Sequence, residues 1–486
     1  MYSKELYFKL SFSMTKTKLF IDNFIIYGIG GTISKAIPVL MVPIVTRIMP
    51  SSVYYGLSDM SNTLVSIAGV MATLGIYDGL FRMYFETEDR NYRKAACSTA
   101  LTFALICSMV VFFILVGFRK QLSIILFGSR EYGYLVLISS VTVLVGSSNQ
   151  IVAAPTRMQN RRRVFLAVNV ASAIATYSIA IFLLLRGHYD TGLPFSALIV
   201  SLMIEIFYFV LNREWFGFRD FDLRVLRQML IIAIPLVPNF LTYWVFNSCD
   251  RIMITNIMGL KYLGIYSIGA KLGHCSQLLY TAFAGGWSYF VFSTMHDRDQ
   301  VKYNSKLFEV LAIVSLVSMA FLCVGSRWLY KLLFPKEYLD GFLVVPYLYL
   351  SPLLLMLFQM SSSQFAVVKK TWFGMISLAA GAIVNIMLNS IMIPKLGIEG
   401  AAIATLCGYS ISLLICLIIL SVNKWFVVSG RIKISFFSAI CFLFAWRTWG
   451  IESYLIAFVF LLLFVMESGL LFRREILHVI RRTQSA

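Results

Sequence analysis

Basic side chains occur inside and at the ends of long apolar stretches of this sequence. Lys35 and Lys271 each fall well within such a stretch, whereas Arg47, Arg82 and Arg251 fall near the ends. An isolated charge in the interior of a membrane costs several kcal/mol, so an ionisable residue there predicts a function or a partner. A lysine ammonium can act as a point charge toward phosphate. We therefore predict that these cations bind an anionic group.

Three acidic residues accompany these cations. Asp250 adjoins Arg251, and Asp78 precedes Arg82 by four residues, the spacing that lets two side chains meet on one helical face. Glu205 has no partner nearby in the sequence. These acids predict ion pairs or a site for a coupling ion. The alternative for the arginines is that they extend from helix ends to the membrane surface.

The composition shows which elements must position these residues. The chain has 486 residues, of which 59% are hydrophobic and 13% charged. Apolar stretches of about 20 residues, the length that crosses a bilayer as a helix, recur along it. We predict an all-α integral membrane protein with about 14 membrane helices. The predicted spans are 20–46, 58–82, 95–118, 132–155, 164–186, 193–212, 229–250, 262–288, 306–326, 342–366, 371–393, 399–422, 434–449 and 451–472.

The distribution of Lys and Arg predicts the orientation. They concentrate in the N-terminal segment, the even-numbered loops and the C-terminal tail, which places both termini in the cytoplasm. The net charge of +19 is spread over many short loops, so it predicts topology and not a nucleic-acid site. No loop has room for a soluble catalytic domain, and the four histidines lack metal-ligand spacing. We expect no catalytic residue, metal or cofactor.

An internal repeat divides the chain. Tyr54 and Gly56 match Tyr262 and Gly264 at an offset of 208 residues, and "GLPFSAL" at 192–198 matches "GIEGAAI" at offset 205. Because six helices separate the copies, the repeats would be parallel. The predicted parts are a cytoplasmic segment 1–19, six-helix bundles 20–220 and 221–425, two further helices in 426–475, and a cytoplasmic tail 476–486.

Several segments resemble one membrane protein family. "GGTISKAIPVLMVPIVTRIMPSSVYYGLSDM" at 30–60, "CDRIMITNIMGLKYLGIYSIGAKL" at 249–272 and "IPKLGIEGAAIAT" at 393–405 resemble bacterial lipid-linked oligosaccharide flippases, the polysaccharide exporters related to multidrug and toxic compound extrusion transporters. The resemblance implies two bundles around a central cavity that opens alternately to either side. It also implies transport of an undecaprenyl-diphosphate-linked oligosaccharide from the cytoplasmic to the periplasmic leaflet of the bacterial inner membrane.

The implied function assigns roles to the residues singled out above. The cations would hold the diphosphate of the lipid-linked oligosaccharide, the repeat unit of O-antigen or capsule. Membrane lipids and other membrane proteins of polysaccharide assembly would be further partners. Amide and aromatic side chains could contact sugars, although hydrogen bonds between helices and anchoring at the membrane surface are commoner uses of such residues. These candidates are Tyr243, Trp244, Asn247, Asn256, Gln277, Tyr280, Trp287 and Gln359.

Three other functions compete with this hypothesis. A multidrug or cation exporter of the same fold would favour intramembrane carboxylates over the lysines found here. A membrane-embedded polysaccharide polymerase or sugar transferase would need acidic, histidine or metal motifs facing one loop. A passive scaffold would not need lysines deep in the membrane.

Overall fold

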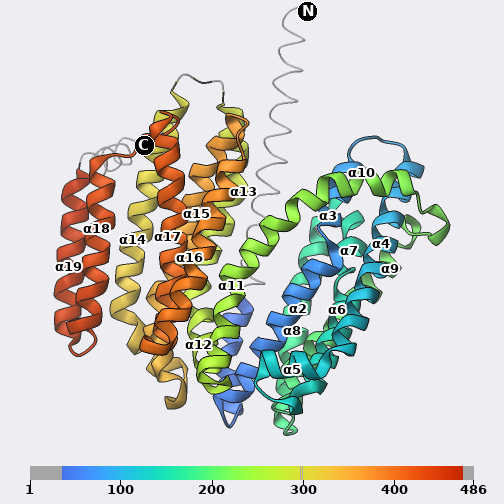
Figure 1. Cartoon of the computed structure of the whole chain (residues 1–486), viewed down its shortest axis with the longest axis horizontal. Helices are drawn as coiled ribbons and strands as arrows, with labels where there is room; N and C mark the ends of the chain where they lie inside the picture. The colour runs from blue at the N-terminus through green and yellow to red at the C-terminus, as the bar shows by residue number, and fades with distance from the viewer. Residues whose placement is uncertain (1–35, 296, 298, 474–486) are drawn as a thin grey trace, which may run out of the picture. The chain divides into compact units, whose positions relative to one another are not determined.

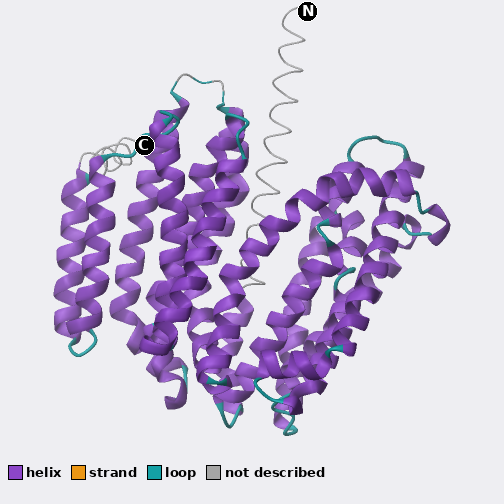
Figure 2. Cartoon of the chain, in the orientation of Figure 1, coloured by secondary structure: helices purple, strands orange, loops and turns teal. Residues whose placement is uncertain are grey.

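The computed structural model of the chain describes residues 36–295, 297 and 299–473. The described residues form helices joined by short loops and contain no strand (Figure 2). The all-α prediction is therefore confirmed. Eleven of the described helices, or twelve when the bent pair α2 and α3 counts as one span, are long and apolar enough to cross a membrane. This count does not test the predicted total of 14 membrane helices, because most of the first predicted span lies outside the described residues.

The chain divides into two compact units, residues 1–264 and 265–486. The boundary between the units lies after the seventh predicted span, 229–250. This span belongs to unit 1 because α10 packs on α3, and α11 packs on α2 and α5. The predicted boundary at residue 220 instead follows the sequence repeat, and the repeat boundaries stay a prediction.

Unit 1 is a bundle of helices around α4, α6 and α9 (Figure 1). A short helix over Ala36–Ile48 precedes it. Figure 1 shows α10 running across the ends of the bundle helices at a steep angle to them. Its helices are α2 (Ser52–Thr73), α3 (Ile76–Tyr84), α4 (Arg90–Gly117), α5 (Arg119–Phe127), α6 (Gly133–Gly146), α7 (Asn149–Met158), α8 (Arg162–Leu185), α9 (Gly192–Leu211), α10 (Leu223–Ala233) and α11 (Val237–Met258), with 3-10 turns η1 (Arg130–Tyr132), η2 (Arg213–Trp215), η3 (Phe218–Asp220) and η4 (Ile234–Leu236).

Unit 2 is built around α15, which packs between α14 and α17 and is the most buried helix of the unit. The segment α12 crosses from unit 1 into unit 2, and α18 and α19 pack against α14. Its elements are α12 (Leu260–Gly273), η5 (His274–Ser276), α13 (Gln277–Ser293), α14 (Gln300–Leu333), η6 (Lys336–Leu343), α15 (Val345–Val367), α16 (Trp372–Leu396), α17 (Ile398–Val422), α18 (Gly430–Ala445), the π-helix η7 (Trp446–Gly450) and α19 (Tyr454–Leu471).

Capping side chains fix where several helices begin. Ser51 accepts a hydrogen bond from the backbone N–H of Val53 at the start of α2, and Asp89 does the same for Asn91 at the start of α4. A capping oxygen of this kind satisfies one of the four N–H groups that a helix leaves unpaired at its beginning, and contributes about 1 kcal/mol.

The second predicted span is broken within the membrane. Leu74 and Gly75 have φ of 46° and 71°, and the span bends by 49° between α2 and α3. A left-handed conformation is costly for a leucine and cheap for a glycine. Broken membrane helices are tolerated where the freed backbone groups find partners or face water. The predicted span 58–82 therefore falls on two helices, α2 and α3, with a break between them.

The two copies of the repeated motif meet at one helix crossing in unit 1. A Cβ added to Gly56 of α2 would overlap the carbonyl oxygen of Leu260, and a Cβ added to Gly264 would overlap the carbonyl oxygen of Ser52. The hydroxyl of Ser52 donates to the carbonyl oxygen of Lys261 at 3.2 Å. The absence of side chains therefore allows the backbones of α2 and α12 to touch.

Candidate functional site

The predicted cations lie in different environments. Lys35 lies outside the described residues. Lys271 is half-buried in the last turn of α12, in unit 2. Arg47 is exposed near the end of the helix Ala36–Ile48, and Arg82 is exposed in the last turn of α3. Their roles in binding an anion stay predictions.

Arg251, the remaining predicted cation, is held by two carboxylates. Its Nε lies 2.7 Å from Oδ2 of Asp59 on α2, and its Nη1 lies 3.3 Å from Oδ1 of Asp250. Nη1 also donates to the carbonyl oxygen of Asn247, one turn earlier in α11. The Arg251 and Asp59 side chains are 13% and 8% exposed. An anionic ligand at Arg251 would therefore have to compete with two carboxylates already in place.

Adjacency in the sequence predicts the contact between Asp250 and Arg251, but nothing in the sequence indicates Asp59. The two paired residues Asp59 and Arg251 are separated by 192 positions. Asp59 lies at the start of the predicted span 58–82, and its charge is the only signal by which it could have been selected.

The half-helix α3 after the break carries the other predicted pair. Asp78 and Arg82 are both exposed, and no ion pair joins them in the described part of the chain. Two other arginines contact α3. Arg157 of α7 donates from Nη1 to the hydroxyl of Tyr77 at 2.7 Å, and Arg93 of α4 donates from Nε to the carbonyl oxygen of Tyr84 at 3.0 Å. The guanidinium carbon of Arg157 also lies 5.0 Å from the ring centroid of Phe165. The sequence suggests only a topological role for arginines at this end of the fourth span.

Glu205 has a partner that the sequence does not reveal. Ser148 lies in the two-residue break between α6 and α7, and its Oγ lies 2.8 Å from Oε1 of Glu205 on α9. The second carboxylate oxygen of Glu205 is buried and makes no hydrogen bond within the described part of the chain. The structure thus places a carboxyl group against a break in a membrane helix.

Unit 2 contains a buried polar cluster that sequence reasoning missed. Glu399, at the start of α17, is 4% exposed. Its Oε1 lies 2.6 Å from Nε of Arg447 and accepts a hydrogen bond from the hydroxyl of Tyr347 at 3.1 Å. Arg447 belongs to the π-helix η7, a rare element that often marks a functional or strained position. The cluster joins α15 and α17 to the C-terminal helices.

Several of the polar and aromatic candidates bond within their own unit. The hydroxyl of Tyr280 donates to Oε1 of Gln359 at 2.7 Å, and the indole N–H of Trp287 donates to Oγ of Ser363 at 3.1 Å. In unit 1, the indole N–H of Trp244 donates to Oγ of Ser66 at 3.0 Å. These bonds are the interhelical use that membrane bundles commonly make of such residues. Contact with sugars stays a prediction.

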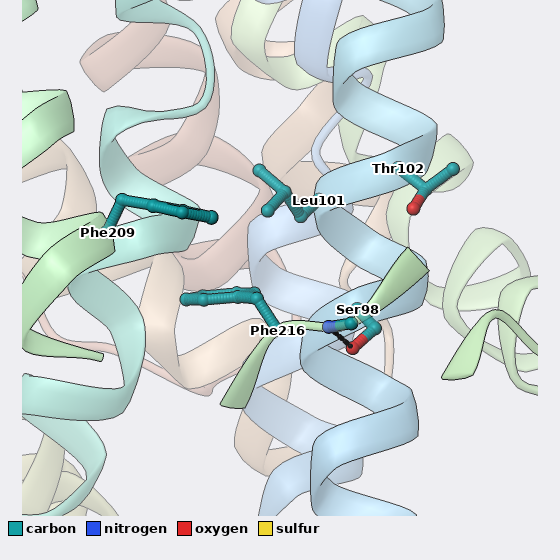
Figure 3. Close-up of a pocket in the computed structure, with 6 residues that line it drawn as sticks. Ser98, Leu101, Thr102, Phe209 and Phe216 are labelled. Atoms are coloured by element: carbon teal, nitrogen blue, oxygen red, sulfur yellow. Dashed lines mark hydrogen bonds between the residues drawn. The ribbon is translucent and has the colours of Figure 1, made fainter. Parts of the chain in front are cut away.

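A small pocket in unit 1 lies between α4, α9 and the segment that follows η2 (Figure 3). The rings of Phe209 and Phe216 stack at 6.1 Å on one side of it, and Oγ of Ser98 accepts a hydrogen bond from the N–H of Gly217 at 3.0 Å. Leu101 and Thr102 complete its lining. Because no charged side chain lines this pocket, it does not suit a phosphate group.

Solved structures with the same arrangement of helices are transporters. The lipid II flippase MurJ in an inward closed conformation matches with a TM-score of 0.68 at 17% identity, over 93% of this chain and 100% of that one. An inward-facing multidrug resistance MATE family transporter of the MOP superfamily matches with a TM-score of 0.60 at 12% identity, over 80% and 95% of the two chains. An outward-facing structure of such a transporter has a TM-score of 0.57 at 13% identity, over 82% and 96%. At these identities the matches show the fold.

The comparison of sequences gives the family. No curated protein sequence matches the chain. The family described as "Polysaccharide biosynthesis protein" matches residues 44–342, which is more than half of the chain and includes α2 to α14. The protein therefore belongs to this polysaccharide biosynthesis family, with the helical membrane fold that MurJ and the MATE transporters share.

Proposed function

We propose that the protein moves undecaprenyl-diphosphate-linked oligosaccharides, the repeat units of O-antigen or capsule, from the cytoplasmic to the periplasmic leaflet of the bacterial inner membrane by alternating access. The observation that carries this proposal is the family match over residues 44–342. The fold supports it, since one structure of the same fold is a lipid II flippase. Both termini would lie in the cytoplasm, and other membrane proteins of polysaccharide assembly would be partners.

The substrate's charge indicates which residues to test. A diphosphate that crosses the hydrocarbon region needs cations to offset the cost of desolvation. Lys35 and Lys271 are the cations that lie inside predicted spans, although the structure ends helix α12 two residues after Lys271. Arg47 and Arg82 are exposed side chains near helix ends. Arg251 is the weakest candidate of the predicted set, because Asp59 already neutralises it.

The test measures arrival of the oligosaccharide at the periplasmic leaflet in cells that lack their own flippase. Lys35→Ala and Lys271→Ala should each lower transport about tenfold or more, because a hydrogen bond to a charged group contributes about 1.5 to 3 kcal/mol. Lys261→Ala is the matched control, since Lys261 is an exposed lysine on the same helix α12. Full transport by both variants at wild-type abundance would remove the two lysines from the site.

A multidrug or cation exporter is the second candidate, because MATE transporters share the fold. In the same cells, this candidate predicts that the wild type raises resistance to cationic dyes and restores no surface polysaccharide. The flippase proposal predicts the reverse result.

A further inference from the structure

Glu205 is the sole Asp, Glu, Lys, Arg or His in the membrane portions of four helices. Residues 133–156 cover α6 and most of α7, residues 164–185 cover most of α8, and residues 192–211 cover α9. Within these three ranges Glu205 is the one residue of these five types. It lies six residues before the end of α9, about 9 Å along the helix axis. A charged carboxylate at this depth would need a partner that its neighbouring helices do not supply.

Two contacts of Ser148 can both be hydrogen bonds only when this carboxyl group is the neutral acid. Oγ of Ser148 lies 2.8 Å from Oε1 of Glu205 and 3.0 Å from the carbonyl oxygen of Val145. Both distances are hydrogen-bond distances, but a serine hydroxyl has one hydrogen and the carbonyl oxygen has none. If Ser148 donates to Val145, the contact with Glu205 is a hydrogen bond only when Glu205 donates. An ionised Glu205 would leave one of the two contacts unbonded.

The second oxygen of the carboxyl group supports the same conclusion. Oε2 of Glu205 is buried and accepts no hydrogen bond from any residue that the structure describes. An ionised carboxylate carries charge on both oxygens, so a buried and unbonded oxygen is far more costly in that form than in the neutral acid. Oγ of Ser147 and Oδ1 of Asn149, on either side of Ser148, are also buried, and neither forms a hydrogen bond among residues 36–295, 297 and 299–473. The break between α6 and α7 is thus a polar site inside an apolar bundle.

We propose that Glu205 is a proton-binding site that releases and rebinds its proton during transport. Its coupling role rests on the proposed flippase function, whereas its proton occupancy does not. On release, the O–H bond of the carboxylic acid breaks, the proton passes to water, and the electron pair stays on the carboxylate. The hydrogen of Ser148 then turns from Val145 to Oε1 of Glu205, so the carboxylate keeps one donor. The site would couple transport to the proton gradient.

The charged groups around α9 do not compete for this role. The helices that pack on α9 are α8, α6, α7 and α2. On α2 the one charged residue is Asp59, which is paired with Arg251. The others lie at helix ends: Arg157 near the end of α7, Arg162 and Arg163 at the start of α8, and Arg213 and Glu214 in η2.

The first experiment detects the proton directly. Infrared spectra of the purified full chain in detergent should show, at neutral pH, a carboxylic acid C=O band that Glu205→Gln removes. Ser148→Ala should shift this band, because the hydrogen-bond partner is lost while the carboxyl group remains. Raising the pH should abolish the band in a one-proton titration. A spectrum unchanged by Glu205→Gln, or by Ser148→Ala where the first variant does not fold, would overturn the proposal.

The second experiment tests exchange during transport. Oligosaccharide transport by the wild type should fall when a protonophore collapses the proton gradient, and residual transport by Glu205→Gln should be insensitive to it. The matched control is Glu467→Gln, because Glu467 of α19 also faces a serine, with Oγ of Ser438 at 2.6 Å. This control should keep the wild-type sensitivity. Wild-type sensitivity in Glu205→Gln would overturn the coupling role. A wild type without transport would refute the flippase function, and the infrared result would still decide the proton site.

Discussion

Asp59→Asn should destabilise the protein far more than Glu214→Gln, although both replace a carboxylate in a short ion pair by an amide. Asp59 lies 2.7 Å from Arg251, and Glu214 lies 2.6 Å from Arg90. The exposed fractions of the two acidic side chains differ, at 8% for Asp59 and 51% for Glu214. Because the distances are almost equal, the comparison isolates the effect of burial.

The expected loss of unfolding free energy depends on the environment of the arginine that each substitution leaves without its carboxylate. Breaking a buried pair costs about 3 to 5 kcal/mol, because the remaining charge stays away from water. Asp250, 3.3 Å from Arg251, still faces the guanidinium in Asp59→Asn, so we expect the lower value, about 3 kcal/mol. Breaking the exposed pair costs about 0 to 1 kcal/mol, because water solvates the arginine that remains.

The measurement is the free energy of unfolding in mixed micelles, from titration with a denaturing detergent. The double variant Asp59→Asn with Arg251→Gln should lose less stability than the sum of the single variants, by about 1 to 3 kcal/mol, because the two residues share one interaction. Equal losses for Asp59→Asn and Glu214→Gln, or additive losses in the double variant, would refute the argument that burial makes this pair important.

Two further stability predictions use contrasts within the chain. Gly56→Ala should cost about 1 to 3 kcal/mol, because its methyl group would overlap a carbonyl oxygen of α12, whereas Gly69→Ala on the same helix meets open space and should cost nothing. Thermal unfolding of both variants in detergent checks this, and equal midpoints would contradict it. Arg447→Gln should cost about 3 kcal/mol, because it leaves the carboxylate of Glu399, 4% exposed, without a cation. Tyr347→Phe removes one hydrogen bond to the same carboxylate and should cost about 1 kcal/mol, so the reverse order in the same unfolding assay would rule out this account.

Hydropathy predicts the membrane helices to within a few residues over most of the chain. The predicted spans 164–186 and 399–422 correspond to Arg162–Leu185 and Ile398–Val422. Hydropathy does not predict where a span is interrupted, because it measures transfer into lipid and not backbone continuity. Two breaks lie inside stretches whose hydropathy shows no interruption: the break at Leu74 and Gly75, and the break before Asn149.

The same limit applies to the candidate site. A single sequence shows which charges lie in apolar stretches, so it identifies Glu205 and Arg251 as residues that need an explanation. It does not show their partners, because Ser148 is 57 positions from Glu205 and Asp59 is 192 positions from Arg251. The one partner that the sequence does indicate is Asp250, the neighbour of Arg251.

The structure gives a physical reason for the glycine that both copies of the repeated motif contain. Gly56 and Gly264 occupy equivalent places in the two copies, and so do Ser52 and Leu260, at the same offset of 208. The backbone of Ser52 leaves no room for a side chain at Gly264, and that of Leu260 leaves none at Gly56. Reciprocal contacts of this kind are what a two-fold relation between equivalent segments produces. Since a methyl group on either glycine would push against backbone, no change of side chain in the other copy could make room for it.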